Sequence, residues 1–159
     1  MDHIKPIQLI LTPIDFGQAS DHALDMAMQF GKVLEARLTL IHVVQTPSIV
    51  GFDSGMGVSQ YIDEVTSQAR QSLAQYAQRV QASGLACEAV TEIGSPFQLI
   101  VDYAATQQVD MIVMGTHGHT GLQHMLLGSV AERVVRLATC PVLVTRGEQK
   151  ESAAAEDEK

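Results

Sequence analysis

Residues 7–44 decide the fold, because two apolar runs in them flank a helical pattern. The first run, Ile7–Ile14 (I-Q-L-I-L-T-P-I), ends at a turn-like D-F-G over 15–17. Near-continuous hydrophobicity of this kind is typical of a strand covered on both faces. The second run, Arg37–Val44 (R-L-T-L-I-H-V-V), is short and β-branched, as strands are. Apolar residues at helical spacing over 20–34 predict a helix between them, and therefore a right-handed βαβ unit whose first strand is central.

The rest of the chain repeats this alternation. Helices are predicted over 60–82, 95–106 and 129–138, and strands over 85–93, 110–114 and 141–145. Glu88 and Glu92 interrupt the apolar character of strand 85–93, which favours an edge position. The pattern predicts an α/β fold: a doubly wound, five-stranded parallel sheet with helices on both faces. Ligands of such sheets bind outside the carboxyl ends of the strands, where the strand order reverses.

Composition limits the classes of partner. The 159 residues suit one domain, and the formal net charge of -8 argues against nucleic acid and against anionic membranes, which attract basic proteins. No apolar run approaches the roughly 18 to 20 residues of a membrane span, and the N-terminus does not read as a signal peptide. We therefore expect a cytoplasmic protein without membrane insertion. Cys87 and Cys140 are interpreted as small buried thiols rather than a disulfide.

Two segments are not expected to form regular structure. Residues 45–59 hold three glycines, one proline and three serines, which predicts a long loop. A lid, a partner-binding segment and a plain connection all remain open for it. Residues 147–159 hold five acids and no large apolar side chain, so a disordered acidic tail is predicted after a nucleotide-binding domain over 1–146.

A glycine-rich stretch follows strand 110–114. Gly115, Gly118 and Gly121 are followed by Gly128-Ser129 at the start of a helix. Without a Cβ atom, Gly115 and Gly118 can take positive φ and let main-chain N–H groups approach an anion, while Gly128 leaves the helix N-terminus open. Ser129 is a candidate both to cap that helix and to donate to a phosphate oxygen. The stretch predicts a phosphate-binding loop.

The spacing Gly115-x2-Gly118-x9-Gly128-Ser129 resembles the ATP-binding class of the universal stress protein family. The resemblance covers residues 5 to 146, and four further stretches are similar to that family: I-L-T-P-I-D (10–15), I-H-V (41–43), L-L-G-S-V-A-E-R-V-V (126–135) and C-P-V-L-V (140–144). Gly17 departs from the family, in which serine is frequent, and this removes a possible cap for the first helix.

The resemblance implies an adenine nucleotide, ATP with Mg²⁺ as a candidate companion, a strand order of 3-2-1-4-5 and a homodimer along the fifth strand. The segment with Pro13, Ile14 and Asp15, together with Val43, would border adenine and ribose. Met114 would form the base of the pocket. The ribose and phosphates would be surrounded by Gly115, His117, Gly118, Gly128, Ser129 and Val130. No catalytic residue and no metal ligand is assigned.

Three functions remain open from the sequence. The first is a nucleotide-binding regulator in the stress response whose ligand state alters dimerisation or partner binding. The second is a slow ATPase or self-phosphorylating enzyme, although the chain lacks a G-x-x-x-x-G-K-[ST] lysine and an obvious pair of Mg²⁺-binding acids. The third is a nucleotide-free dimeric interaction module. Asp15 is interpreted as facing ligand rather than only ending a strand.

Overall fold

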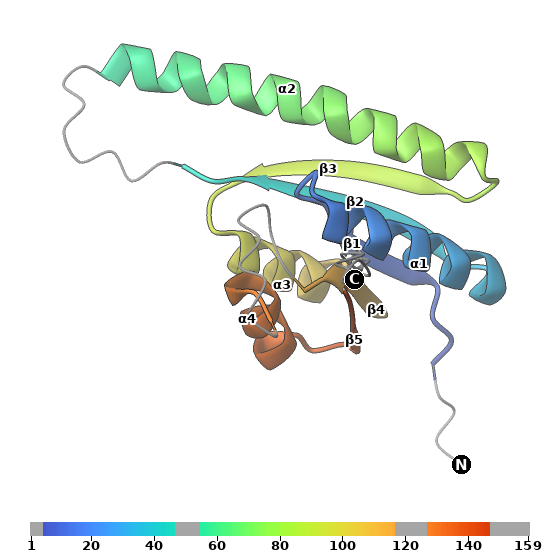
Figure 1. The fold of residues 1–159 in the computed structure, drawn as a ribbon. Helices are drawn as coiled ribbons and strands as arrows, with labels where there is room; N and C mark the ends of the chain where they lie inside the picture. The colour runs from blue at the N-terminus through green and yellow to red at the C-terminus, as the bar shows by residue number, and fades with distance from the viewer. Residues whose placement is uncertain (1–4, 47–54, 117–126, 147–159) are drawn as a thin grey trace, which may run out of the picture.

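The computed structural model describes residues 5–46, 55–116 and 127–146, with the side chains of residues 55 and 56 left out. These residues form one parallel sheet with helices on both faces (Figure 1). The elements are β1 (Leu9–Pro13), α1 (Gln18–Leu34), β2 (Arg37–Val44), α2 (Gly55–Ala82), β3 (Cys87–Ile93), α3 (Pro96–Thr106), β4 (Met111–Gly115), α4 (Ser129–Leu137) and β5 (Val142–Thr145). Strand and helix alternate as the sequence predicts.

The sheet order is β3-β2-β1-β4-β5 and every pairing is parallel. This confirms the predicted order 3-2-1-4-5, with β1 at the centre and β3 at an edge. The apolar run of β1 is explained by its position, because Ile10 and Leu11 are fully buried. The order reverses between β1 and β4, the place where ligands bind in open sheets of this kind.

Two apolar cores lie on opposite faces of the sheet. The helices α1 and α2 bury Leu24, Leu73 and their neighbours against one face. The helices α3 and α4 bury Ile100, Val134 and their neighbours against the other. Figure 1 shows the long α2 lying over β3 and β2. Each helix packs by the stripe of apolar residues that its 3.6-residue period brings to one side.

The predicted loop over 45–59 is wrong in its last part, because α2 begins at Gly55 and residues 55–59 are helical. Adding a turn to an existing helix costs little compared with nucleating one, so a segment of weak propensity extends a long helix. Residues 47–54 of that loop lie outside the described residues, as does the tail over 147–159. Their roles stay predictions.

Smaller differences occur at the ends of elements. The strand predicted over Ile7–Ile14 pairs only over Leu9–Pro13, where its partner strand runs alongside. Ser95 occupies the predicted cap position of α3, but its side chain makes no capping hydrogen bond. The helix α2 ends before Ser83 and Gly84, as predicted, and Gly84 takes a left-handed φ of 90°.

The sequence also led to expectations for the two cysteines and for membrane-spanning helices. Cys87 and Cys140 are free thiols, but both are half-buried rather than buried. Burial raises the pKa of both thiols, which makes them poor nucleophiles at neutral pH. Across the described residues, no helix has both the length and the hydropathy needed to cross a bilayer.

Candidate functional site

The carboxyl end of β1 is tied to β2 by two hydrogen bonds. The Ile14 N–H donates to the Ile41 carbonyl at 2.8 Å, and His42 Nδ1 lies 2.7 Å from the Ile14 carbonyl. A carbonyl only accepts, so Nδ1 carries the proton that forms this bond. The two bonds hold Ile14, which is buried, and the following Asp15 beside the strand that carries Val43.

Asp15 lies in a tight turn that its own carboxylate helps to close. The Gly17 N–H donates to Asp15 Oδ1 at 2.9 Å. The buried Ser20 hydroxyl donates to the Gly17 carbonyl at 2.9 Å, and the Asp15 N–H points to Ser20 Oγ at 3.4 Å. The carboxylate is therefore fixed in orientation at the N-terminus of α1, where negative charge is favoured.

Gly17 is the N-cap residue of α1 and makes no side-chain capping bond, as its lack of a side chain requires. A Cβ atom at this position would lie 3.1 Å from Asp15 Oδ1. A larger residue would therefore press on the carboxylate that the turn orients. The departure at Gly17 removes a cap, and it also leaves space for Asp15.

An aromatic contact supports the same turn from the side of α2. Phe16 takes a left-handed φ of 63°, a conformation that costs a bulky residue on the order of 1 to 3 kcal/mol. Its ring lies 4.4 Å from that of His42 and 5.6 Å from that of Tyr76, between centroids. The Tyr76 hydroxyl donates to Asp21 Oδ1 at 2.6 Å. Burial and this bond to Asp21 raise the pKa of Tyr76 to about 12.

The carboxyl end of β4 approaches the start of α4. The Thr116 N–H donates to the Thr145 carbonyl at 2.9 Å, and the Gly128 N–H donates to the Thr116 carbonyl at 2.6 Å. The second bond brings two residues that are twelve positions apart in sequence into contact. Met114, just before this junction, is buried in the core beneath α3 and α4.

The predicted reason for glycine at Gly115 is wrong. Gly115 does not take a positive φ; the described glycines that do are Gly84 and Gly94. Instead, a Cβ atom at Gly115 would lie 2.7 Å from the backbone C and O atoms of Ala19. Glycine is needed here because the end of β4 packs directly on the first turn of α1. The residue is a close-approach position rather than a flexible one.

The predicted cap of α4 is also wrong. Gly128 is the N-cap residue, with φ −71° and ψ 157°, and Ser129 is the first helical residue. The first N–H groups of a helix have no partner within it, and a glycine N-cap has no side-chain oxygen to accept from them. Ser129 is exposed and Val130 is half-buried. The start of α4 thus offers backbone donors and a hydroxyl at the end of the sheet where the strands finish. We call this end the carboxyl edge and the opposite end, where the strands begin, the amino edge.

The structure brings most of the predicted site residues to this one edge. Pro13, Ile14 and Asp15 follow β1, Val43 lies near the end of β2, and Met114 and Gly115 end β4. Gly128, Ser129 and Val130 begin α4. His117 and Gly118 lie outside the described residues. Within the described ranges, no group of three or more His, Cys, Asp or Glu side chains is placed to hold a metal ion.

Three residues that sequence reasoning did not assign to the site support it: Phe16, Ser20 and His42. His42 is marked in the sequence as a polar residue within an apolar stretch, but this does not identify its partner, and Phe16 and Ser20 carry no such signal. The Arg133 guanidinium carbon lies 4.7 Å from the centroid of the Phe97 ring. Arg136 pairs with Glu132 on α4 at 3.6 Å.

Known proteins of one family resemble this chain in sequence and in fold. A model of the universal stress protein family matches residues 6–146. Universal stress protein MJ0531 of Methanocaldococcus jannaschii is 33% identical over 142 residues, covering 89% of this chain and 84% of the relative. The solved structure of hypothetical protein MJ0577, from the same organism, has a TM-score of 0.79 at 28% identity and covers 92% of this chain and 100% of that one.

A second similar structure was solved with a nucleotide. The universal stress protein from Archaeoglobus fulgidus was solved in complex with dAMP, and it has a TM-score of 0.63 at 19% identity. It covers 87% of this chain and 96% of that one. At this identity the likeness concerns the fold.

Proposed function

Since the chain belongs to the universal stress protein family, we propose that it is a cytoplasmic regulator in the stress response that binds ATP at the carboxyl edge of its sheet. Adenine and ribose would lie against Pro13, Ile14, Asp15 and Val43, above Met114. The ribose and phosphates would meet Gly115, His117, Gly118, Gly128, Ser129 and Val130. The state of the bound nucleotide would alter dimerisation or partner binding.

The observation that carries the proposal is the start of α4. Its glycine N-cap, its backbone donors and the exposed Ser129 lie where the strand order reverses. Backbone N–H groups and the positive end of the helix dipole make such a terminus suited to phosphate. The orientation of Asp15 by Gly17 and Ser20 adds a fixed acceptor near the expected base and sugar.

A nucleotide fits these residues chemically. Ile14 and Met114 are buried and apolar, and Val43 is half-buried, which suits an adenine ring rather than a charged group. The dAMP in the Archaeoglobus fulgidus relative is an adenine nucleotide and supports the same class of ligand here. Mg²⁺ would be held mainly by the ATP phosphates, as is usual for an ion that keeps most of its water.

The test is a charge placed at the start of α4. Ser129→Asp puts a carboxylate where it stabilises a helix N-terminus but repels a polyphosphate. We expect calorimetry to show at least a tenfold loss of ATP affinity, equivalent to about 1.4 kcal/mol, with no fall in Tm. Adenosine, which lacks phosphate, should bind both proteins equally.

The matched control is Ser67→Asp, which adds the same charge at an exposed position on α2 and should bind ATP as the unmodified chain does. Equal ATP affinity in Ser129→Asp and the unmodified chain would contradict the proposal. Phosphate release should be measured in the same samples. Steady release that Ser129→Asp abolishes would favour the slow ATPase instead.

We also propose a homodimer along β5, which is the outermost strand beyond β4 among the residues that the structure describes. The Pro141 and Thr145 carbonyls accept from the β4 side, and neighbouring residues alternate in direction, so the Val144 N–H faces the outer edge. Val144→Pro removes that donor without disturbing the pairing with β4. Sedimentation should show a dimer for the unmodified chain and a monomer for this variant.

A further inference from the structure

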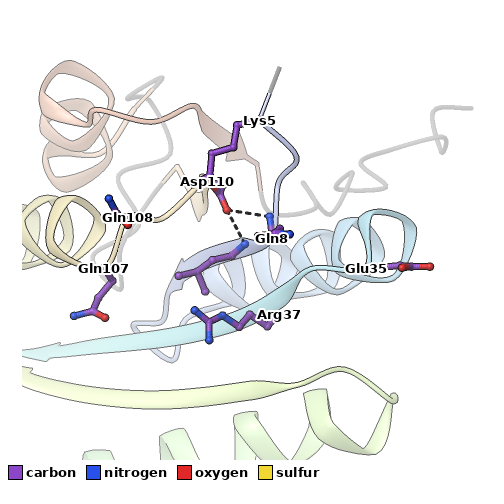
Figure 2. Close-up of a pocket in the computed structure, with 8 residues that line it drawn as sticks. Lys5, Gln8, Glu35, Arg37, Gln107, Gln108 and Asp110 are labelled. Carbon is purple, nitrogen blue, oxygen red and sulfur yellow. Dashed lines mark hydrogen bonds and ion pairs between the residues drawn. The ribbon is translucent and has the colours of Figure 1, made fainter. Parts of the chain in front are cut away.

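A pocket of about 440 Å³ lies at the opposite end of the sheet from the candidate nucleotide site. It is formed where β1 and β2 begin and where the chain leaves α3 to enter β4 (Figure 2). Its volume falls in the range of small-molecule sites, roughly 300 to 1,000 Å³. Charged and amide side chains dominate its lining, so its ligand must be polar. We call it the amino-edge pocket.

One acid and one cation in the amino-edge pocket, Asp110 and Lys5, already pair with each other. Asp110 Oδ2 accepts from the Gln8 and Leu9 N–H groups at 2.9 and 3.0 Å, and Oδ1 lies 2.6 Å from Lys5 Nζ. Burial alone would raise the pKa of Asp110, but the bonds from Lys5, Gln8 and Leu9 hold that pKa below its usual value. The charges of Asp110 and Lys5 offset each other.

Arg37 is the cation that remains for a ligand. Its backbone N–H donates to the Gln8 carbonyl, which fixes its main chain at the pocket. Its exposed guanidinium makes no hydrogen bond or ion pair with another part of the chain that the structure describes. Figure 2 shows the Glu35 carboxylate turned away from Arg37. The planar guanidinium fork matches a carboxylate in a bidentate arrangement.

The opposite sign of charge comes from two helix ends. Glu35 is the C-cap of α1 and Gln107 is the C-cap of α3, and both line the amino-edge pocket. The C-terminal end of a helix carries partial negative charge and favours a cation. The side-chain amides of Gln107 and Gln108 add acceptors as well as donors. A phosphate dianion is disfavoured by these ends, whereas a ligand that carries both signs suits them.

Two helices end at the same place with a residue in the left-handed conformation. Among the described residues other than glycine, Phe16, Glu35 and Gln108 take left-handed φ values, and the last two, at 55° and 53°, line the amino-edge pocket. Both residues close a helix, because the Ala36 N–H donates to the Gly31 carbonyl and the Val109 N–H donates to the Ala104 carbonyl, and a left-handed residue is usual at such helix ends. Phe16, the remaining one, lies at the candidate nucleotide site.

We propose that the amino-edge pocket binds a small zwitterion of the amino-acid class. Its carboxylate lies on the Arg37 guanidinium, and its ammonium group faces the C-terminal end of α3, where Gln107 and Gln108 lie. The site is separate from the carboxyl edge and does not depend on nucleotide binding. The protein then has a second small-molecule binding site in addition to the nucleotide site.

The experiment is an NMR titration of the full chain, labelled with ¹⁵N, with the twenty free amino acids one at a time. We expect at least one of them to shift the amides of Gln8, Arg37, Gln107 and Gln108 with a Kd of about 1 mM or below. The methyl ester of that amino acid lacks the carboxylate, its N-acetyl form lacks the ammonium, and both should bind at least tenfold more weakly.

Two variants locate the interaction. Arg37→Gln removes the guanidinium from an exposed side chain and should weaken binding at least tenfold, a loss of about 1.4 kcal/mol. Arg70→Gln removes the same charge from an exposed position on α2 and should bind as the unmodified chain does. Circular dichroism should confirm that both variants are folded.

Several outcomes would overturn the proposal. They are the absence of amide shifts at the pocket for every amino acid, equal binding of the ester or the N-acetyl form, and unchanged binding by Arg37→Gln. Inorganic phosphate shifting the same amides at lower concentration than any amino acid would assign the pocket to anions instead. None of these outcomes involves nucleotide binding.

Discussion

The two edges of the sheet differ in sign because all strands run in one direction and all helices run back in the other. Helices α1, α3 and α4 begin near the carboxyl edge, so that edge presents backbone N–H groups and suits anions. Helices α1 and α3 end near the amino edge, which presents carbonyl groups and suits cations. The carboxyl edge is held by backbone carbonyls that accept from His42 and Ser20. The amino edge is held by the carboxylate of Asp110, which accepts from backbone N–H groups.

A parallel α/β sheet therefore has two chemically distinct ends before any functional residue is added. A side chain at either end has to complement the local helix termini or be paired. Asp110, an acid at the end with helix C-termini, is paired with Lys5 and with two backbone donors. Asp15, an acid at the end with helix N-termini, is held by one N–H group and keeps accepting capacity for a ligand.

The largest effect is expected at Gly115, where the carboxyl edge depends on close packing. Gly115→Ala places a Cβ atom 2.7 Å from the Ala19 backbone and should lower the free energy of unfolding by about 3 kcal/mol. Urea denaturation measures it. Gly57→Ala is the control, because nothing lies within 4 Å of that Cβ, and it should stabilise α2 by about 0.5 kcal/mol. Equal effects of the two variants would show that β4 and α1 separate easily.

The amino edge should be weakened by Asp110→Ala, which removes three interactions at once. We expect a loss of about 2 kcal/mol in the free energy of unfolding at pH 7. The folded pKa of Asp110 lies below its usual 3.8, so its contribution is present above that pH and is lost as pH falls through the folded pKa. The difference between the two proteins should therefore narrow below about pH 4.

The control for Asp110 is Asp63→Ala, at an exposed position on α2, which should change the free energy of unfolding by less than about 0.5 kcal/mol. A constant difference between Asp110→Ala and the unmodified chain from pH 7 to pH 3 would mean that packing rather than charge holds the amino edge.

His42 sharpens the comparison at the carboxyl edge, where it donates to the Ile14 carbonyl. His42→Phe keeps a ring against Phe16 but removes the donor, and we expect about a fivefold loss of ATP affinity, near 1 kcal/mol. His42→Asn keeps a donor at a similar position and should retain most of the ATP affinity of the unmodified chain. Calorimetry measures both. Similar affinities for these two variants would remove His42 as the residue that positions Ile14 and Asp15.

The smallest effect concerns Tyr76, which supports the carboxyl edge from α2. Tyr76→Phe removes the bond to Asp21 and should cost about 1 kcal/mol or less in the free energy of unfolding. The folded pKa of about 12 exceeds the usual 10.0, so the contribution of Tyr76 is complete below pH 10 and declines as pH rises toward 12. Urea denaturation should show that the free energy of unfolding falls less between pH 8 and pH 11 for Tyr76→Phe than for the unmodified chain.

The fold was largely readable from residue patterns. The continuous apolar run at Ile10 and Leu11 predicts a strand buried on both faces, and both residues are fully buried. Glu88 and Glu92 predict the edge position of β3, which the sheet order confirms. The extent of α2 was not readable, because residues 55–59 carry loop-like composition and become helical by extending the amphipathic stretch that follows them.

For the candidate site, sequence reasoning placed most of the described residues at one end of the sheet but gave the wrong reason for some of them. The glycines of the predicted phosphate loop mark a junction, but Gly115 is required by its contact with Ala19 and not by a positive φ. Ser129 was expected to cap α4, and Gly128 occupies that position instead. No sequence motif reveals the amino-edge pocket, because it is lined by ordinary surface residue types from separate segments, such as Arg37, Gln107 and Gln108.

By itself the sequence determined the alternation of strand and helix, the central and edge strands, and the edge at which a ligand is expected. These follow from local periodicity and from the handedness of parallel βαβ units, which depend on neighbours along the chain. Only the tertiary structure decided which donors meet which acceptors: His42 with Ile14, Gly128 with Thr116, and Asp110 with Gln8 and Leu9. The physical reason is that hydrogen bonds act over about 3 Å, and such separations between distant segments are set by packing.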